Sequence, residues 1–581
     1  MFNKKSISKR NWELNQIEER LILSFSQKLQ IPLLLSKLLL IRNINEDNYD
    51  NFINPNFFTY LIDPNSLKDM EKASLRVMNA IKNNERIGII ADYDVDGSTS
   101  LSILHKFLKN FTNKIFFNIP NRLIEGYGPN FRIMDDMLEK KVDILFTVDC
   151  GTNSFNIIDN KKYKNLDVIV IDHHLSEAIL PDVFAIINPN RIDEKNNLSN
   201  LAAVGVTFLF LLSLRKTLRE NNYFKNKKEP NLMNYLDLVS LGTICDVVKL
   251  VDYNRLFVKK GLELINKRKN NAITNLIDKS KINSSPTSLD VGYFIGPQLN
   301  AASRIDDSKL PAKLLTSYDI NEIDNISTKL NLLNEKRKII ENKIFNESIK
   351  QAELQKKNKF ILVYGENWHN GVLGIIASKL ISYFYKPCLV ISFEKNLGVG
   401  SARSIENLDL GRVILNAKNL KIIDEGGGHS MAAGFKLNIA NINKFKNFLN
   451  NEFNKFDDSL FKKIEKFDGI LSVNEINNEL ITIIDQLQPY GNGNPEPQFI
   501  IKDLIIDTIK IIKEKHIMIF YKNLLGENLK AICFNCIGTE LGEYLINFKK
   551  YSFYFSCNIK KDDFNYSKKP QLIIKDAMII N

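Results

Sequence analysis

Hydrophobic positions between residues 70 and 190 follow two alternating patterns. Short runs of Ile, Val, Leu and Phe are separated by longer segments in which apolar residues recur every three or four positions. The short runs predict buried strands, and the longer segments predict amphipathic helices. The predicted strands are residues 87–91, 115–119, 144–148, 168–171 and 185–187. Strands and helices that alternate in this way are typical of an α/β fold, with a parallel sheet covered by helices on both faces.

The pattern changes twice further along the chain. Residues 321–358 contain no Pro or Gly and place apolar residues at helical spacing, which predicts one long connecting helix or two in series. Residues 359–455 begin with another predicted strand and carry Gly-rich segments, so we expect a second α/β domain there. Residues 456–581 contain short alternating segments of β-branched and aromatic residues, which predict a small β-barrel.

These patterns divide the chain into five expected parts. Residues 1–69 are assigned to an N-terminal helical segment with a packing role, and residues 70–320 to the first α/β domain. Residues 321–358 are the connecting helix, 359–455 the second α/β domain, and 456–581 the barrel. A chain of 581 residues is long enough for three or four domains.

Composition is that of a globular protein, with 44% hydrophobic and 25% charged residues. The longest apolar run, residues 202–214, is too short to cross a bilayer as a helix, and the basic N-terminus is not followed by an apolar core. We therefore expect no membrane contact, no signal peptide and a cytoplasmic location. The six cysteines show no framework of paired spacings, so we expect reduced thiols, and the lone Cys533-Phe-Asn-Cys536 is a weak indication of zinc.

The net charge of +12, from 79 basic and 67 acidic residues, favours a polyanionic partner. The many Lys, Asn, Ile and Phe residues are what an AT-rich genome encodes, so part of the positive charge has that origin. Lysines alternate with aromatic residues in 549–555, which fits a surface that binds single-stranded nucleic acid. An ordinary barrel core with a solvated Lys rim explains this segment at least as well.

Three carboxylates follow the strand predicted at residues 87–91. They are Asp92, Asp94 and Asp96, and Gly97 comes directly after them. The carboxyl end of a strand is where open α/β sheets bind their ligands. Carboxylates so close together repel one another unless a cation lies among them, and Mg²⁺ and Mn²⁺ prefer oxygen ligands. An acidic surface turn is the alternative interpretation of this stretch alone.

Further acidic groups follow other apolar runs. Asp149 comes after the strand predicted at 144–148, the sequence Asp172-His173-His174 comes after the next strand, and Asp246 lies in an apolar context. The chain has only six histidines, and two of them are adjacent here. Imidazole together with carboxylates suits a pair of Mg²⁺ or Mn²⁺ ions.

The order of these motifs resembles a known superfamily. Asp94-Val-Asp96-Gly, Asp149-Cys-Gly and Asp172-His-His are similar to the DHH phosphoesterases. Four further motifs resemble the RecJ family, which are bacterial exonucleases specific for single-stranded DNA and acting in the 5′→3′ direction: Pro120-Asn-Arg122 with Glu125-Gly-Tyr-Gly128, the segment 296–304, the segment 400–404, and the segment 427–434. The resemblance covers nearly the whole chain. It implies a DHH domain and a DHHA1 domain joined by a long helix, followed by an OB-type β-barrel.

The resemblance also implies roles for the acidic residues and histidines. Two divalent ions are expected on one set of ligands, which is Asp94, Asp96, Asp149, His173 and Asp246. We expect Asp149 to bridge the two ions. Asp92 is expected either to contact the metal ligands from behind or to serve as an alternative ligand. His174 is expected either to face the scissile phosphate or to orient a ligand. Two ions would lower the pKa of a water molecule and stabilise the attacking and leaving oxygens, so no nucleophilic side chain is required.

Phosphate contacts are implied for a second set of residues. Arg122, Arg304, Ser401 and Arg403 match positions that contact phosphate, including the terminal 5′-phosphate, and Arg304 is also counted among the catalytic residues. Guanidinium groups suit this recognition because they form paired hydrogen bonds with phosphate oxygens. Contacts to the DNA backbone are expected from one Gly-rich segment, which is Gly427, Gly428 and His429. Trp368 and His369 are expected to line the path of the strand.

Three positions depart from the family pattern, namely Lys249, Gln298 and Ser303. Lys249 replaces a usual Pro, Gln298 replaces a usual Arg and removes a phosphate contact, and Ser303 replaces a Gly in what we expect to be a loop that places Arg304.

The leading hypothesis is a metal-dependent exonuclease that degrades single-stranded DNA from the 5′ end to mononucleotides, in recombination and repair. One alternative is a phosphodiesterase for short oligonucleotides or cyclic dinucleotides. Another is a catalytically inactive DNA-binding scaffold at the replication fork. We also expect the protein to be a monomer, and we expect a single-strand-binding protein and a helicase as its partners.

Overall fold

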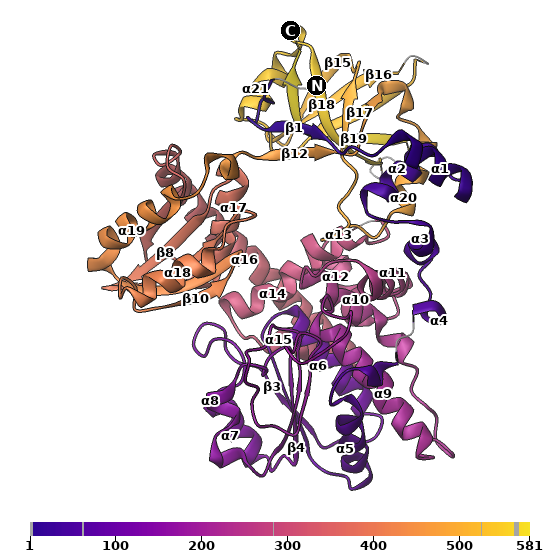
Figure 1. The fold of residues 1–581 in the computed structure, drawn as a ribbon, viewed down its shortest axis with the longest axis vertical. Helices are drawn as coiled ribbons and strands as arrows, with labels where there is room; N and C mark the ends of the chain where they lie inside the picture. The colour runs from indigo at the N-terminus through magenta and orange to yellow at the C-terminus, as the bar shows by residue number, and fades with distance from the viewer. Residues whose placement is uncertain (1–3, 61–62, 283, 524–525, 563–568, 581) are drawn as a thin grey trace.

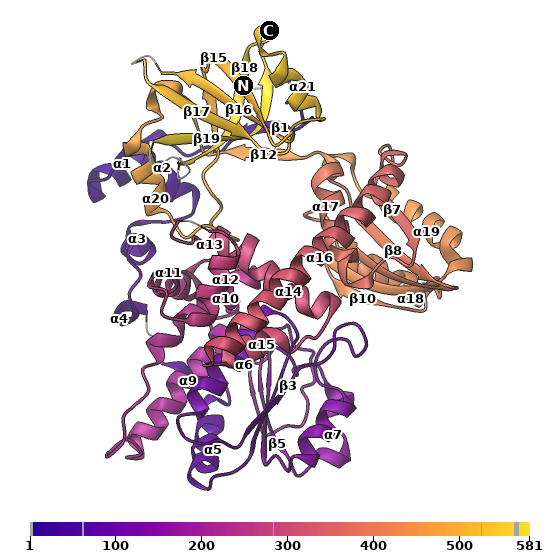
Figure 2. The same ribbon diagram turned by 180° about the vertical axis from the view of Figure 1, so that it is seen from behind.

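A computed structural model of the chain describes residues 4–60, 63–282, 284–523, 526–562 and 569–580. Figure 1 shows three parts: a mixed helix and sheet part in indigo to magenta, a second one in orange, and a strand-rich part in yellow. Both ends of the chain lie at the strand-rich part, as the view from behind in Figure 2 also shows. The long helix that joins the first two parts is visible in the same views.

The first part contains a five-stranded sheet with the order β3-β2-β4-β5-β6, and all of its neighbouring strands are parallel. The strands are β2 (Ile87–Ala91), β3 (Ile115–Asn118), β4 (Ile144–Val148), β5 (Asp167–Ile171) and β6 (Ala185–Ile187). Each predicted strand is therefore confirmed to within one residue at either end. The parallel sheet in this region confirms the α/β fold class.

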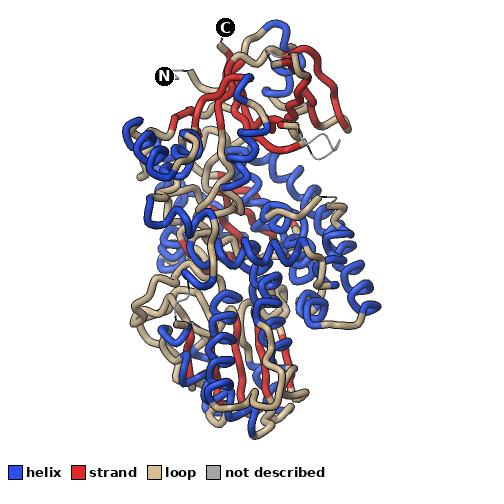
Figure 3. Tube along the Cα trace, turned by 90° about the vertical axis from the view of Figure 1, so that its right-hand side faces the viewer, coloured by secondary structure: helices blue, strands red, loops and turns tan. Residues whose placement is uncertain are grey.

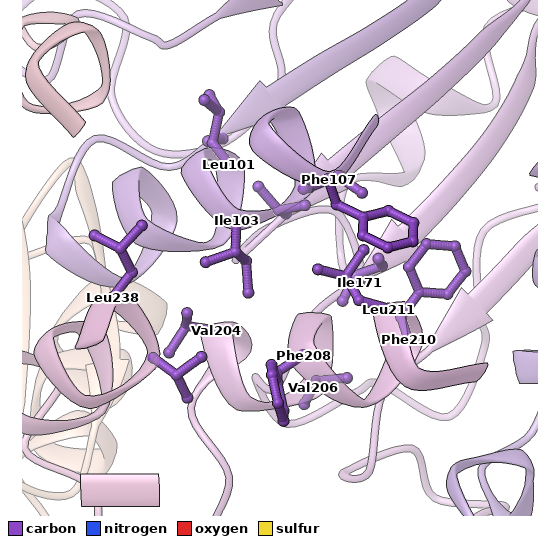
Figure 4. Packing of buried hydrophobic residues seen from close by; sticks show 14 of the residues in the cluster. Leu101, Ile103, Phe107, Ile171, Val204, Val206, Phe208, Phe210, Leu211 and Leu238 are labelled. Atoms are coloured by element: carbon purple, nitrogen blue, oxygen red, sulfur yellow. The ribbon is translucent and has the colours of Figure 1, made fainter. Parts of the chain in front are cut away.

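Both faces of this sheet are buried, which explains why its strands are continuous apolar runs rather than alternating ones. Ile89 and Phe146 face a core that includes helices α6 and α9, whereas Ile90 and Leu145 face a core that includes helix α7. Figure 4 shows the first core, where Phe107 of α6 and Phe210 of α9 lie near Ile171 of β5. The rigid sheet thus fixes where the loops at its carboxyl edge lie.

Helices make up most of the rest of this part. Their bounds are α5 (Met70–Lys82), α6 (Val95–Leu108), α7 (Phe131–Glu139), α8 (Phe155–Ile158), α9 (Ala203–Glu220), α10 (Leu236–Cys245), α11 (Asp252–Asn266), α12 (Asn271–Lys279), α13 (Ser288–Asp290), α14 (Gly296–Ile305) and α15 (Leu310–Thr316). The predicted connecting segment is a single helix of 34 residues, α16 (Ile320–Glu353). Helix α16 packs against α14 on one side and α17 on the other, so it sets the spacing between the first two parts.

The second part is built on a mixed sheet with the order β10-β11-β9-β8-β7. Its strands are β7 (Ile361–Glu366), β8 (Cys388–Glu394), β9 (Leu397–Arg403), β10 (Glu425–His429) and β11 (Ala432–Asn438). Only β7 and β8 are parallel, and the other pairs are antiparallel. The helices are α17 (Leu373–Phe384), α18 (Leu410–Asn419) and α19 (Ile442–Asn454), with α17 and α16 packing on one face of the sheet and α18 and α19 on the other.

The third part is a seven-stranded sheet with the order β13-β14-β18-β19-β17-β16-β15. The bounds are β13 (Gly469–Ser472), β14 (Phe499–Lys502), β15 (Ile506–Ile512), β16 (His516–Lys522), β17 (Asn528–Cys533), β18 (Phe553–Lys561) and β19 (Pro570–Ile579), with helices α20 (Asn478–Gln486) and α21 (Glu540–Ile546). Within the described ranges, no strand pairing joins β13 to β15. The prediction of β-structure in this region is therefore confirmed, whereas its closure into a barrel by hydrogen bonds is not observed.

The N-terminal segment packs on two parts of the chain: its first half lies on the third part, whereas α3 and α4 contact α11 of the first part. Strand β1 (Asn11–Leu14) pairs in parallel with β12 (Ile464–Phe467), next to the seven-stranded sheet. Helices α1 (Glu19–Leu29), α2 (Leu33–Ile41), α3 (Glu46–Ile53) and α4 (Phe57–Tyr60) follow. Leu35 and Leu38 of α2 share a core with Leu480 and Ile484 of α20. The segment has the predicted packing role, but it also contributes a strand that the helical prediction missed.

Figure 3 shows the strands in separate regions of the molecule, with helices around and between them. In the part of the chain that the structure describes, no helix combines the length and the apolar character that crossing a membrane requires. All six cysteines carry free thiols, as expected.

Candidate metal and phosphate sites

The acidic turn after β2 is held in shape by its own backbone. Asp94 caps helix α6, because its carboxylate accepts a hydrogen bond of 3.1 Å from the main-chain nitrogen of Gly97. A Cβ at Gly97 would lie 2.4 Å from the carbonyl oxygen of Asp92, so only glycine fits there. Asp92 and Asp96 are consequently buried on either side of the cap.

The neighbouring strands bring their own acidic ends to the same edge of the sheet. Asp149, directly after β4, has a φ of 59°, and its main-chain nitrogen donates to the carbonyl oxygen of Ile171 at 3.0 Å. The hydroxyl of Tyr127 donates to the carbonyl oxygen of Asp149 at 2.9 Å. Asp246 arrives from elsewhere, as the residue that ends helix α10. Because β2, β4 and β5 are adjacent and parallel, their carboxyl ends converge on one site.

His173 lies at the centre of the cluster. Its Nε2 is 3.4 Å from Oδ1 of Asp149, 3.6 Å from Oδ2 of Asp246 and 3.9 Å from Oδ2 of Asp96. Its Nδ1 is 3.1 Å from the carbonyl oxygen of Leu201. A carbonyl can only accept, so Nδ1 carries the proton and the neutral ring presents the lone pair of Nε2 to three carboxylates. This is the arrangement of a metal-binding imidazole.

The carboxylates resist ionisation where they lie. Burial, reinforced by the charge of Asp94, raises the pKa of Asp96 to about 7 and the pKa values of Asp92 and Asp149 well above the usual range. Burial and the charges of Asp96 and Asp94 raise the pKa of Asp246 to about 9. Such repulsion is relieved when cations bind among the groups.

Two buried carboxylate oxygens of this cluster lack a hydrogen-bond donor in the described structure, namely Oδ1 of Asp92 and Oδ2 of Asp246. Three overlapping groups of side chains have ligand atoms within 4.8 Å of one another: Asp92, Asp94 and Asp149; Asp149, His173 and His174; and Asp96, His173 and Asp246. Asp149 and His173 each belong to two groups. Unpartnered oxygens and hard oxygen and nitrogen donors fit a pair of divalent cations such as Mg²⁺ or Mn²⁺.

Asp96 has a second task in this cluster. Its two carboxylate oxygens accept hydrogen bonds of 2.7 Å and 2.9 Å from the main-chain nitrogens of Ala203 and Val204, at the start of α9. A Cβ at Gly242 would lie 2.2 Å from Oγ1 of Thr99 and 3.1 Å from Oδ1 of Asp96, which explains the glycine in α10 beside this carboxylate. The position of this carboxylate is therefore fixed before any cation binds.

His174 is held by a residue to which the sequence analysis gave no role. Its Nδ1 lies 2.8 Å from Oδ1 of Asp172 and 3.1 Å from the hydroxyl of Tyr127. Burial alone would lower the pKa of His174, but the hydrogen bond and charge of Asp172 outweigh it and raise the pKa to about 9. Burial opposes the ionisation of Asp172 too, yet the two histidines hold its pKa well below the usual value. The only indication in the sequence was the place of Asp172 directly before the His pair.

The arginines form a second cluster. Arg304 of α14 is half-buried, and its Nη1 donates to the carbonyl oxygen of Gly371 at 3.0 Å. Burial, followed by the charges of Arg122, Arg337 and Arg403, lowers the pKa of Arg304 to about 9. Burial and the charge of Arg122 lower the pKa of Arg403 as well. The structure thus brings together the three arginines singled out in the sequence and adds Arg337, a mutually repelling set that favours binding of an anion.

This arginine cluster lies at the start of helix α17. A Cβ at Gly374, in the first turn of that helix, would lie 3.0 Å from Nη2 of Arg403 and 3.1 Å from Oγ of Ser401. A helix N-terminus presents main-chain N–H groups and a partial positive charge. Arg337 comes from α16, where Glu341 and Asn334 hold its guanidinium. Sequence reasoning missed Arg337 because it lies among many polar residues of a long helix.

The Gly-rich segment expected to contact DNA forms β10, the edge strand of the second sheet. Cross-strand register places Gly427 opposite Gly434 and then Ser401, and His429 opposite Ala432 and then Arg403. Gly427 and His429 are therefore in register with Ser401 and Arg403 of the arginine cluster, which lie two strands away on β9. Open space surrounds the α-carbon of Gly427 on the side where a Cβ would point.

Two expectations from the sequence are wrong, those for Ser303 and Trp368. Gln298 is buried and its amide donates to Oγ of Ser280 at 2.6 Å, and the loss of a phosphate contact at this position stays a prediction. Ser303 lies inside helix α14 and not in a loop, because the helix continues to Ile305. Trp368 is buried in the core of the second part, where its Nε1 donates to Glu347 at 2.8 Å, and it does not line a strand path.

Comparison with known proteins follows the same division of the chain. Three family models match: the N-terminal domain of the DHH family at residues 86–243, the DHHA1 domain at residues 357–455 and the RecJ OB domain at residues 467–576. The chain is 30% identical over 579 residues to the single-stranded-DNA-specific exonuclease RecJ of Bacillus subtilis, covering 98% of this chain and 71% of that protein. It is 34% identical over 496 residues to the protein of the same name in Haemophilus influenzae, covering 83% and 86% of the two chains.

Solved structures support the fold. The crystal structure of RecJ in complex with Mn²⁺ from Thermus thermophilus superposes with a TM-score of 0.79, at 22% identity, and covers 98% of this chain and 79% of that chain. A crystal structure of exonuclease RecJ bound to manganese superposes with a TM-score of 0.58, at 28% identity, and covers 68% and 96% of the two chains.

Proposed function

The chain belongs to the RecJ family of single-stranded-DNA-specific exonucleases, and we propose that it hydrolyses single-stranded DNA from the 5′ end and releases mononucleotides. The observation that carries this proposal is the cluster around His173, whose Nε2 lone pair faces Asp149, Asp246 and Asp96 at 3.4–3.9 Å. The two relatives described above, which are named for this activity, are 30% and 34% identical over most of this chain.

The ligand set that we propose for two divalent cations is Asp94, Asp96, Asp149, His173 and Asp246, with Asp149 shared and Asp92 as an additional carboxylate. Bound there, Mg²⁺ or Mn²⁺ supplies the Lewis acidity that activates water and offsets the charge developing on the scissile phosphate. Asp92 fits this role because one of its oxygens is buried without a hydrogen-bond donor.

His174 acts beside these ligands. In the metal-free protein Asp172 occupies Nδ1 of His174 and raises its pKa to about 9, which favours the protonated ring. The remaining nitrogen, Nε2, can donate a hydrogen bond to a phosphate oxygen of the substrate. A cation held in this position stabilises negative charge that grows in the transition state.

Recognition of the 5′ end is assigned to the arginine cluster. Arg122, Arg304, Arg403 and Ser401 would bind the terminal phosphate at the start of α17, and the edge strand with Gly427, Gly428 and His429 would contact the backbone further along the strand. In this proposal, binding of the terminal phosphate holds the first internucleotide phosphate at the carboxylate cluster, which supports cleavage from the end rather than within the strand.

The domain functions that we propose follow the domain boundaries expected from the sequence. Residues 70–320 are the catalytic DHH domain, 321–358 the connecting helix, 359–455 the DHHA1 domain and 456–581 an OB-type nucleic-acid-binding domain, supported by the three matching family models. We also propose a monomer that works in the cytoplasm, in recombination and repair, on strands delivered by a helicase and a single-strand-binding protein.

Two other activities are less well supported. A phosphodiesterase for very short oligonucleotides would not need the third part of this chain. An inactive scaffold would not need the carboxylates and the histidine that converge here. The complete ligand set therefore favours catalysis.

The test is a digest of end-labelled DNA. Purified protein with Mn²⁺ is given single- and double-stranded 40-nucleotide substrates, with and without a 5′-phosphate, labelled at either end. We expect mononucleotides to be released from the 5′ end of the single strand only, faster with a 5′-phosphate, and DNA binding to weaken steeply as salt rises. Degradation from the 3′ end, internal cleavage, or digestion restricted to dinucleotides would contradict the proposal.

A further inference from the structure

The segment that follows the metal-site residue Asp246 has a strained backbone. Asp246 ends helix α10, and the next residue, Val247, has a φ of 59°. Glycine or asparagine usually occupies this left-handed position after a helix, and a β-branched side chain is the least suited to it. The side chain of Val247 is 64% exposed, so burial of that side chain does not hold the conformation.

What holds Val247 is a loop from the third part of the chain. The side-chain amide of Asn492 donates to the carbonyl oxygen of Val247 at 2.7 Å. The carbonyl oxygen of the same residue, Asn492, accepts from the main-chain nitrogen of Leu250, also at 2.7 Å. Asn492 thus bonds both ends of the segment 247–250, directly after the carboxylate that faces His173.

The loop around Asn492 is shaped for this approach. Gly493 has a φ of 76°, and a Cβ there would lie 3.1 Å from Cβ of Lys249. A Cβ at Gly491 would lie 2.7 Å from Cδ1 of Leu250. Both glycines let the loop backbone reach the segment after Asp246, and neither position tolerates a larger residue without movement. Lys249, one of the three departures from the family pattern, is a contact of this loop.

Residues 487–490, which precede Asn492 in the same loop, are also bound to the first part of the chain. The buried guanidinium of Arg255, in α11, donates to the carbonyl oxygens of Leu487 at 3.2 Å and Gln488 at 2.7 Å. Oγ of Ser288 donates to the carbonyl oxygen of Tyr490 at 2.6 Å. These bonds fix the part of the loop that precedes Asn492 to the first part of the chain, which makes Asn492 a rigid support and not a chance surface contact.

We propose that Asn492 is a positioning residue for the metal centre: its amide and carbonyl hold segment 247–250 in a strained conformation that aims Asp246 at the cations. This inference rests on the proposed metal site. It gives the third part of the chain a role in metal binding in addition to any contact with DNA. In this proposal Asn492 binds neither metal nor substrate and acts only through its hydrogen bonds to the backbone of Val247 and Leu250.

The experiment measures Mn²⁺ affinity directly, by electron paramagnetic resonance of free Mn²⁺ in titrations of the full-length protein. Asn492→Ala removes the side-chain donor to Val247 and keeps the main-chain bond to Leu250, and we expect Mn²⁺ binding at one of the two sites to weaken about tenfold, as other changes behind metal ligands do. Asn492→Asp keeps the size and removes the donor, so it should behave alike even if the alanine variant is unstable. Asn478→Ala, an exposed asparagine of α20, is the matched control and should leave Mn²⁺ affinity unchanged.

Rescue separates positioning from general stability. Val247→Gly removes the strain, because glycine adopts a positive φ without help, so the double variant Val247→Gly with Asn492→Ala should recover most of the lost affinity. Wild-type Mn²⁺ affinity in both Asn492 variants would overturn the inference, and so would a loss that Val247→Gly does not restore. A wild-type protein that binds Mn²⁺ and leaves DNA intact would refute the proposed nuclease function and leave this inference standing.

Discussion

His173 Nδ1 lies 3.1 Å from the main-chain carbonyl oxygen of Leu201, and this one hydrogen bond decides the tautomer of the ring. The proton resides on Nδ1, so Nε2 faces the carboxylates as a lone pair. Burial and the neighbouring His174 lower the pKa of His173 to about 4, which keeps the ring neutral at physiological pH. Several buried carboxylates would repel one another in the absence of cations. Cations bound between these carboxylates and the neutral imidazole would remove that repulsion.

Asp172 should control the charge of His174. In Asp172→Asn the amide cannot accept the Nδ1 hydrogen bond as a carboxylate does, so the pKa of His174 should fall from about 9 towards its ordinary value. We expect kcat at pH 8 to fall about 10–100-fold, the range seen when a group behind an active-site histidine is changed, with little change in KM. Histidine titration by NMR and a pH profile of kcat check both parts. An unshifted His174 resonance would show that Asp172 does not set this charge.

Arg403 should set the preference for a 5′-phosphate. Arg403→Ala removes a charge-assisted contact worth about 1.5–3 kcal/mol, so KM for a 5′-phosphorylated strand should rise about 10–100-fold. The same strand with a 5′-hydroxyl should change much less. Arg403→Lys keeps the charge and loses the paired geometry, so it should recover part of the preference. Equal losses on both substrates would place Arg403 elsewhere on the DNA path.

Substitution by alanine should affect stability differently at two adjacent glycines of β10. Gly428 has a φ of 154°, and a Cβ there would lie 2.4 Å from the carbonyl oxygen of Ala432, so Gly428→Ala should destabilise the hairpin by about 1–3 kcal/mol. Gly427 faces open space, so Gly427→Ala should change stability by less than about 0.5 kcal/mol. Urea denaturation compares the two variants. Gly427→Glu, which adds a negative charge at the same place, should weaken binding of single-stranded DNA if β10 follows the strand.

Metal removal should make stability depend on pH in a defined direction. The raised pKa values of Asp246 and His174, both about 9, mean that the folded protein binds protons more tightly than the unfolded chain above pH 6.5. Stability without metal should therefore fall as pH rises from 6.5 to 9.

Cations replace the protons, so saturating Mn²⁺ should flatten this dependence, and the gain in Tm from Mn²⁺ should be larger at pH 8.5 than at pH 6.5. Thermal melts in EDTA and in Mn²⁺ at both pH values provide the measurement. A gain in Tm that is the same at both pH values would contradict the assignment of these groups to the metal centre.

Much of this architecture could be predicted from local patterns. The five strands of the first sheet are short, fully buried and bounded by polar turns, so their periodicity is unambiguous, and the long helix lacks any breaking residue. The acidic groups could be placed at one edge because parallel strands share a direction. Asp246 could be grouped with them only through the family resemblance, since it comes from a helix about 150 residues later.

What could not be predicted depends on contacts between distant segments. Residues 11–14 form strand β1, which pairs with β12 some 450 positions away, and no local pattern encodes that partner. Gln298 looks like an exposed polar residue until Ser280 is placed beside it. The roles of Arg337 and Asn492 arise from the packing of one domain on another, which residue spacing along the chain does not report.

The most direct test of the metal centre is Asp149→Ala, measured for Mn²⁺ binding, cleavage of 5′-labelled single-stranded DNA and DNA affinity in the same preparation. Asp149 belongs to two of the three groups of candidate ligands and is fully buried, so its loss should remove Mn²⁺ binding and reduce cleavage to background. Affinity for single-stranded DNA should remain, because the arginine cluster is untouched. Cleavage at the wild-type rate by this variant, with Mn²⁺ still bound, would contradict the account.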